Sequence, residues 1–152
     1  MGLSEILIWI VIGLAFAILA FAIYVRLAPI QADRWQNAEI PTLAPGVYPS
    51  IGGHAVVAVV PDAQAALMAL DGIVRATPRT RLVAGSVADG RVTYVTRSAL
   101  WGFPDYTSVQ AVSGPDGQAA IHVQGHLRFG QSDLGVNRKR IEGWLAALDA
   151  GG

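Results

Sequence analysis

The chain has 152 residues, enough for one modest domain, and 53% of them are hydrophobic while only 14% are charged. Its formal net charge is zero and it has no basic stripe, which argues against nucleic-acid binding. It contains no cysteine, which excludes disulfides, thiol nucleophiles, thiolate metal sites and a lipid-modified cysteine.

The hydrophobic excess comes from one N-terminal segment. Positions Ile6–Val25 read ILIWIVIGLAFAILAFAIYV and contain no charge. A helix of about 20 apolar residues crosses the hydrocarbon core of a bilayer. Trp9 and Tyr24 lie near the two ends of the segment, where amphipathic rings favour the interface. We therefore predict a single-pass transmembrane anchor over residues 1–27, with Ile6–Val25 in contact with the lipid bilayer.

A cleaved signal peptide is the rival interpretation of this segment. Such a peptide needs a basic leader, a shorter apolar core and a small-x-small cleavage site. The leader MGLSE has no lysine or arginine, and the candidate site PIQA has Ile30 where a small residue belongs. These features favour a retained anchor. The abundance of alanine and glycine and the single lysine, Lys139, indicate a GC-rich bacterial genome and hence a bacterial plasma membrane.

Proline and glycine dominate the segment that follows. Residues 28–53 contain four prolines and three glycines. Because proline at this density blocks helix and discourages sheet, we predict an extended tether here, leading to a domain over residues 54–150. Trp35, within the tether, has two open interpretations: a juxtamembrane anchor, or a ring that packs back on the domain.

The first half of the predicted domain contains a strand, a helix and a hairpin. Ala55–Val60 predicts a short strand. Asp62 is placed to cap the helix that follows, and Pro78 ends that helix. Two β-rich runs flank Asp89-Gly90, which predicts a hairpin because both turn residues tolerate positive φ.

The second half completes an antiparallel meander. Strands are expected over Tyr106–Val112 and Ala119–Phe129, with a turn at Ser113–Gly117 between them. A last helix carries an apolar stripe made of Ile141, Trp144, Leu145 and Leu148. We predict an α+β fold: an N-terminal transmembrane helix, then an antiparallel four- to five-stranded meander sheet with two helices packed on one face.

Two stretches carry a dense pattern of fixed polar residues. The pattern comprises Arg97-Ser98, Phe103-Pro104-Asp105, Arg128, Gly130, Ser132-Asp133, Gly135, Asn137-Arg138 and Arg140. It resembles the bacterial and plastid family known as domain of unknown function 1499, over roughly residues 79–148. The resemblance implies no activity.

The side of the membrane that carries the domain is left open by two conflicting signals. Arg26 and Arg34 follow the apolar segment and no lysine or arginine precedes it, which favours a cytoplasmic domain. Members of the family that the chain resembles often follow signal peptides or lipoprotein leaders, so the resemblance implies an extracytoplasmic domain.

A polar cluster at the predicted strand ends is the candidate ligand site. A helix N-terminus and arginine guanidinium groups together suit a carboxylate or a phosphate. The candidate ligand-binding residues are Arg97, Ser98, Asp105, Arg128, Ser132, Asp133, Asn137 and Arg138. The competing interpretation, which we favour, is structural: Asp133 caps the last helix, and Asp105 pairs with Arg97 or with an arginine on that helix.

The corner WGFPDY holds three aromatic rings that cannot all face water at low cost. We expect at least one of Trp101, Phe103 and Tyr106 to cover the end of the core beneath Trp144. If two stay exposed, the corner is a docking surface for a protein partner or for the bilayer.

Signatures of catalysis are missing from the sequence. His122 and His126 lie four residues apart on a predicted strand, about 13 Å, which is too far to chelate one ion, so we expect them to face solvent. There is no G-x-S-x-G and no phosphate-binding loop.

We expect no metal or cofactor, and a non-enzymatic domain that binds a protein partner or a small anion in an envelope or membrane complex. The alternative is a membrane-anchored hydrolase that uses Arg97, Asp105, Arg128 and Asp133.

Overall fold

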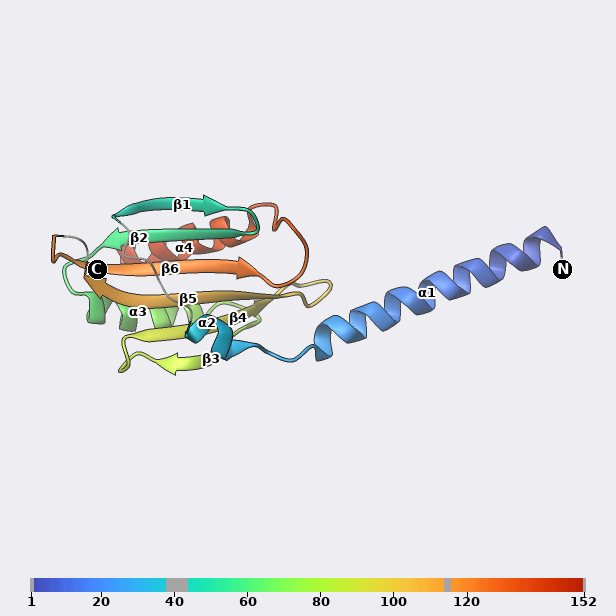
Figure 1. Cartoon of the computed structure of the whole chain (residues 1–152), viewed down its shortest axis with the longest axis horizontal. Coiled ribbons are helices and arrows are strands. Elements are labelled where there is room, and N and C mark those ends of the chain that lie inside the picture. Colours follow the sequence, from blue (N-terminus) through green and yellow to red (C-terminus); the bar gives the residue numbers. More distant parts are fainter. Residues whose placement is uncertain (1, 38–43, 114–115, 152) are drawn as a thin grey trace.

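A six-stranded antiparallel sheet forms the centre of the domain, and a long helix projects from one end of it (Figure 1). This computed structural model describes residues 2–37, 44–113 and 116–151. The elements follow in the order α1 (Leu3–Leu27), α2 (Ala32–Gln36), β1 (Gly46–Ser50), β2 (Gly53–Val59), α3 (Ala63–Arg75), β3 (Thr80–Ser86), β4 (Arg91–Arg97), β5 (Pro104–Ser113), β6 (Ala119–Leu127) and α4 (Val136–Ala150).

Helix α1 contains the uncharged run, and it is long and apolar enough to cross a membrane. A charged residue lies near each of its ends: Glu5 in the first turn and Arg26 in the last. The candidate membrane span predicted from composition is therefore one uninterrupted helix.

The sheet has the strand order β1-β2-β6-β5-β4-β3, and every neighbouring pair is antiparallel. The predicted α+β class is confirmed, but the sheet has six strands where four or five were expected. The unexpected strand is β1, which includes Pro49. It lies at the edge of the sheet, where a strand pairs on one side only and the missing N–H of proline is tolerated.

The segment expected to be an extended tether has structure of its own. Within residues 28–53 the chain forms α2, β1 and the start of β2, while residues 38–43 lie outside the described part of the chain. The ring of Trp35 stacks on His126 at 4.3 Å and on Tyr106 at 5.7 Å between centroids. Of the two interpretations of Trp35, the structure therefore shows the ring that packs back on the domain.

Helices α3 and α4 pack on one face of the sheet, as predicted (Figure 1). The Asp62 carboxylate caps α3 by accepting hydrogen bonds from the N–H groups of Gln64 (2.8 Å) and Ala65 (2.9 Å). The buried core between helices and sheet comprises Val56, Leu67, Leu70, Val74, Val92, Tyr94, Val109, Ile121, Val123, Ile141 and Trp144. Burying each large side chain contributes about 1.5–3 kcal/mol, so this layer dominates the stability of the fold.

The strands themselves follow the predicted order. The hairpin between β3 and β4 turns at Asp89-Gly90, where Gly90 has a φ of 72°. Strands β5 and β6 pair directly, and the turn expected at Ser113–Gly117 includes positions 114 and 115, which lie outside the described residues.

The second face of the sheet is not simply solvated. Helix α2 lies against β3, β4 and β5 on the side opposite α3 and α4 (Figure 1). On this face His122 is buried and His126 is half-buried beneath Trp35, so the expectation that both histidines face solvent was wrong. Polar and apolar residues alternate along β6. This pattern fits a face exposed to solvent, but it fits equally well a face of polar side chains that is buried.

Candidate functional site at the junction of α1 and the domain

Helix α1 is joined to the domain by buried residues and hydrogen bonds. Val25 is fully buried although it belongs to α1. The Arg97 guanidinium donates to the carbonyl oxygens of Gly102 (2.8 Å) and Val25 (3.4 Å). Arg26 in turn donates to the carbonyl oxygen of Leu100 (2.8 Å). The loop over residues 98–103 is therefore held against the C-terminal end of α1.

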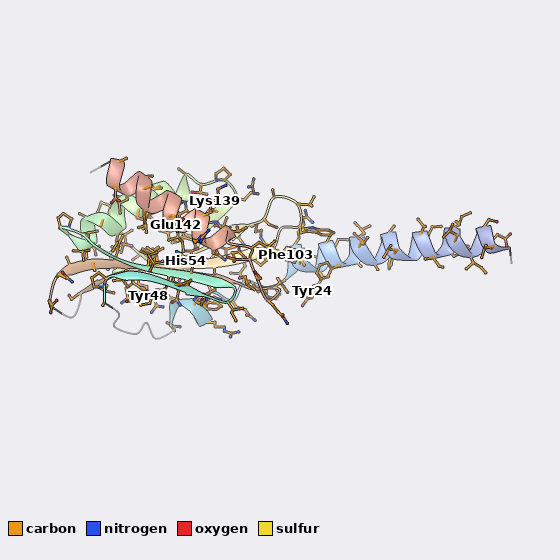
Figure 2. The ribbon with its side chains drawn as sticks, turned by 90° about the horizontal axis from the view of Figure 1, so that it is seen from above. Tyr24, Tyr48, His54, Phe103, Lys139 and Glu142 are labelled. Carbon is orange, nitrogen blue, oxygen red and sulfur yellow. The ribbon has the colours of Figure 1, made fainter. Side chains whose placement is uncertain are left out.

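Aromatic rings fill the other side of this junction. Phe21 of α1 meets Trp101 at 6.4 Å and Phe103 at 6.1 Å, both edge to face. Tyr24 meets Phe129 at 6.2 Å in the same manner. Figure 2 places Tyr24 and Phe103 together where α1 meets the domain. Two of the three rings in the WGFPDY corner thus pack against α1.

Tyr106, the third ring of that corner, behaves differently. It is fully buried on the face covered by α2, and its hydroxyl accepts a hydrogen bond from the N–H of Gln31 at 2.9 Å. The expectation that one ring would be buried is confirmed, but Tyr106 does not lie beneath Trp144, because it points to the opposite face of the sheet. A buried Tyr106 also cannot dock a partner.

Four arginines lie on one side of the loop. Two adjoining cavities of about 420 and 390 Å³ share Arg26, Arg79 and Arg97, and we call this region the arginine pocket. Arg81 lines only the larger cavity and Ser98 only the smaller one. None of the described residues that line it is acidic. The pocket therefore concentrates positive charge beside the end of the apolar helix.

A second cavity, of about 500 Å³, lies on the other side of the loop. We call it the aromatic pocket because Phe21, Phe103 and Phe129 line it. It brings together four of the predicted site residues, namely Ser98, Asp105, Ser132 and Asp133.

The predicted ligand cluster is therefore divided between two pockets. Arg97 lies in the arginine pocket and Asp105 in the aromatic pocket. Arg128 donates to the carbonyl oxygen of Pro29 and lies over the ring of Phe129. None of the cavities described here is lined by all three of these residues.

The two carboxylates of the cluster are already engaged within the protein. Asp105 forms an ion pair with Arg140 of α4 at 3.3 Å, and both side chains are largely buried. Burial raises the pKa of Asp105, and the attraction of Arg140 offsets only part of this effect. The contact joins the corner before β5 to the last helix, as the structural interpretation of the cluster predicts.

Asp133 caps the start of α4. Its carboxylate accepts hydrogen bonds from the N–H groups of Gly135 (3.1 Å) and Asn137 (2.9 Å). Burial acts to raise the pKa of Asp133, but the hydrogen bonds from Asn137 and Gly135 prevail and lower it. Because Asp133 occupies these N–H groups, they are not available to an external anion.

The remaining members of the cluster point elsewhere. Asn137 is fully buried, and its Oδ1 accepts a hydrogen bond from Arg140 (2.9 Å). Arg138 is exposed on the outside of α4 and lies 4.0 Å from Glu142. The Ser132 hydroxyl accepts the N–H of Leu134 (3.2 Å). These contacts shape the loop and the helix start.

A row of buried polar groups beneath α4 was not anticipated. Thr107, Gly125 and His54 are register neighbours on β5, β6 and β2. Side-chain atoms of His54, Thr107 and Asn137 have no hydrogen-bond partner among the described residues. Gly125 is the sequence signal that could have found this row, since a strand glycine often marks a close approach. A Cβ there would lie 3.1 Å from Oδ1 of Asn137.

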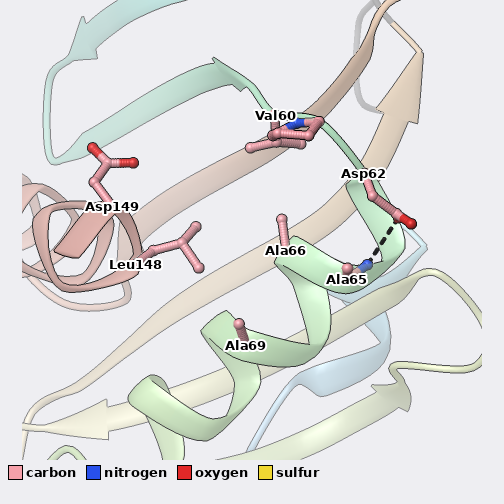
Figure 3. A pocket seen from close by; sticks show the side chains of 8 residues that line it. Val60, Asp62, Ala65, Ala66, Ala69, Leu148 and Asp149 are labelled. Atoms are coloured by element: carbon pink, nitrogen blue, oxygen red, sulfur yellow. Dashed lines mark hydrogen bonds between the residues drawn. The ribbon is translucent and has the colours of Figure 1, made fainter. Parts of the chain in front are cut away.

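A further cavity, of about 380 Å³, lies at the end of the domain away from α1 (Figures 1 and 3). Its lining is mainly apolar and includes Val60, Ala66, Ala69 and Leu148. Figure 3 shows that Asp62 at its rim is bonded to the start of α3. This cavity offers no cationic group to an anion.

The described residues contain no group of three or more histidine and acidic side chains that could hold a metal ion. Sequence reasoning missed Arg26 and Arg79 as site residues. Arg79 lies beside Arg97 because β3 pairs with β4, and the N–H of Arg97 donates to the carbonyl oxygen of Arg79 (3.0 Å). Arg26 lies 71 positions from Arg97 in the sequence, and the packing of α1 on the domain brings it to the pocket.

The comparisons with known proteins bear on this architecture. The family model described as Protein of unknown function (DUF1499) matches residues 31–148, so the match begins before α2 and includes the segment expected to be a tether. No curated protein and no solved structure gives a significant match to the chain. The matched region covers most of the chain, which therefore belongs to the DUF1499 family.

Proposed function

We propose that this chain is a membrane-anchored, non-enzymatic binding domain of a bacterial envelope, and that its arginine pocket takes a phosphate-type anion at the bilayer surface. The observation that carries the proposal is the convergence of Arg26, Arg79 and Arg97 beside the end of an apolar helix. With α1 in the bilayer, the pocket lies at the depth of the lipid headgroups.

The electrostatics of the pocket favour an anion. Three like charges close together repel one another, and no carboxylate among the described lining residues offsets them. Each guanidinium uses one or two N–H donors on backbone carbonyls: Arg26 on Leu100, Arg97 on Gly102 and Arg79 on Arg97. The planar fork of arginine has five donors, so several remain for oxygen atoms of a ligand.

The hydrolase alternative has less support. Asp105 is paired with Arg140, and Asp133 is bonded to the start of α4. The Ser98 hydroxyl accepts the N–H of Phe103 (3.0 Å), and no hydrogen bond among the described residues joins a serine to a histidine. A nucleophile with an adjacent base is thus not assembled.

The ligand could be the headgroup of an anionic lipid or a soluble phosphate, and one experiment separates them. Full-length protein in a neutral detergent is mixed with phosphatidylglycerol or with phosphatidylcholine, and native mass spectrometry counts the bound lipid. In parallel, inorganic phosphate is titrated while the thermal midpoint is followed. Lipid adducts with phosphatidylglycerol alone identify a headgroup site, and stabilisation by phosphate alone identifies a soluble ligand.

The variant Arg79→Gln tests the pocket itself. Losing one charged hydrogen-bonding partner costs about 1.5–3 kcal/mol, so we expect binding to weaken about tenfold or more. Lys139→Gln is the matched control, because it removes the same charge from an exposed position on α4. The proposal would be contradicted if neither phosphatidylglycerol nor phosphate bound. It would also be contradicted if Arg79→Gln and Lys139→Gln weakened binding equally.

A further inference from the structure

The most exposed apolar side chains of the domain gather at one end. Among the described residues outside α1, the three large apolar side chains with the greatest exposure are Ile51 (93%), Leu134 (92%) and Leu100 (74%). They belong to three separate connections, between β1 and β2, between β6 and α4, and between β4 and β5. Figure 1 shows all three connections at the end of the domain from which α1 emerges.

Contacts connect these tips to the junction. Leu100 accepts a hydrogen bond from Arg26 through its carbonyl oxygen, so its backbone lies against the end of α1. Gly52, next to Ile51, lies so close to Leu127 that a Cβ would approach its side chain to 2.6 Å. Leu127 and Asp133, the residue before Leu134, both line the aromatic pocket together with Phe21 of α1. The three tips therefore lie around the end of α1.

Leu134 adds an independent observation. Its backbone has a φ of 52°, in the left-handed region that glycine and asparagine adopt more readily than leucine. At this strained position the chain carries a large apolar side chain that is almost completely exposed. Nothing in the packing of the described domain requires an apolar group there, so its explanation lies in what the surface contacts.

The charges on the same surface are mainly positive. Arg26, Arg79, Arg97 and Arg128 all lie at this end and hold no ion pair with a described residue. Of the two carboxylates at this end, Asp105 is paired with Arg140, and Asp133 is bonded to the N–H groups of Gly135 and Asn137. Basic side chains beside a membrane span are attracted to anionic headgroups, and exposed aromatic and apolar side chains enter the interface.

We propose that this end of the domain rests directly on the bilayer, with Ile51, Leu100 and Leu134 inserted into its interfacial layer. The inference rests on the proposed function only in requiring that α1 spans the bilayer, and it does not require the arginine pocket to bind a ligand. The bilayer is the occupant because α1 delivers this surface to it and because the free charges complement anionic headgroups. The domain would then be held at a fixed height and orientation, with no free tether.

The absence of cysteine makes the test direct, because a single introduced cysteine can carry a nitroxide spin label. Five full-length variants are placed in nanodiscs that contain phosphatidylglycerol: Ile51→Cys, Leu100→Cys, Leu134→Cys, Ala88→Cys and Leu14→Cys. Ala88 is the matched control, since it is exposed in the β3–β4 turn at the far end of the domain (Figure 1). Leu14, in the middle of α1, reports whether the helix is in the bilayer.

The measured quantity is a ratio of two collision rates of the spin label. One is its rate of collision with oxygen, which concentrates in lipid, and the other is its rate of collision with a nickel complex that stays in water. We expect this ratio to be severalfold higher at the three tips than at Ala88, and highest at Leu14. If Leu14 is in lipid while the tips match Ala88, the surface proposal is overturned and the anchor stands. If Leu14 itself is in water, both are overturned.

Discussion

The two faces of the sheet are covered in different ways. One face carries α3 and α4 and an apolar core that includes Leu70, Tyr94 and Ile121. The other face carries the five-residue helix α2, which is held by the stacking of Trp35 and by hydrogen bonds to polar strand residues. Burial of apolar area stabilises the first face, and this requires only that hydrophobic residues recur with the right period. Stacked rings and hydrogen bonds stabilise the second face, and these require particular partner residues.

The largest effect is expected on the α3–α4 face. Leu70→Ala removes a fully buried side chain from the middle of the core and leaves a cavity, so we expect a loss of about 2–5 kcal/mol in the free energy of unfolding. Urea unfolding of the full chain in detergent, followed by circular dichroism, measures it. Met68→Ala on the same helix is the control, since Met68 is exposed and should change little. Equal losses for the two variants would contradict this assignment of the core.

The same contrast explains what the sequence could predict. The cap at Asp62, the apolar stripe on α4 and the turn at Asp89-Gly90 depend on residues near one another in the chain, and all three are confirmed. Helix α2 and strand β1 depend on partners far away. Prolines in that segment argued against regular structure, whereas an edge position in the sheet tolerates Pro49.

The candidate site divides in the same manner. The capping of α4 by Asp133 and the pairing of Asp105 with an arginine of that helix follow from charge and position, and the structure has both. Arg79 is brought beside Arg97 by the pairing of β3 with β4, which follows from the hairpin predicted at Asp89-Gly90. Arg26 carried no such signal, because its place in the pocket depends on how α1 packs on the loop at 98–103, and no hydrophobic periodicity encodes that packing.

A smaller effect is expected from removing Trp35 on the α2 face. Its ring is half-buried and stacks on two others, so Trp35→Ala should lower the free energy of unfolding by about 1–3 kcal/mol. Trp35→Phe keeps an aromatic ring and should recover part of that loss. Backbone hydrogen exchange locates the change: we expect faster exchange in α2 and at its contacts on β4 and β5, and none in α3. Faster exchange in α3 would show that the two faces do not act separately.

The α2 face should also respond to pH through His122. Burial lowers the pKa of His122 to about 4, helped by the positive charges of Arg91 and His126. His122 binds a proton near pH 6.5 in the unfolded chain but only near pH 4 in the folded chain. Its contribution to the free energy of unfolding is therefore complete above pH 6.5 and falls steadily as the pH drops towards 4.

The test compares the slope of stability against pH in the wild type and in His122→Gln. We expect the variant to lose about 2–3 kcal/mol less than the wild type between pH 6.5 and pH 4. Burial also lowers the pKa of His126, which acts in the same direction, so His126→Gln should flatten the remaining slope. A slope unchanged by both substitutions would mean that neither imidazole resists protonation in the folded protein.

The smallest effect is expected where neither face is involved. Arg138 and Glu142 lie 4.0 Å apart on the outer side of α4, and both are more than half exposed. An exposed pair of this spacing contributes about 0.3–0.5 kcal/mol and is screened by salt. Glu142→Gln should therefore lower the unfolding free energy by no more than that, and the difference should vanish in high salt.

Asp105→Asn makes the contrast, because Asp105 and Arg140 are both largely buried and their ion pair is shielded from the salt. We expect the loss of unfolding free energy to persist in high salt for Asp105→Asn and to vanish for Glu142→Gln. This result would distinguish the buried contact that joins the corner before β5 to α4 from an ion pair exposed on the surface.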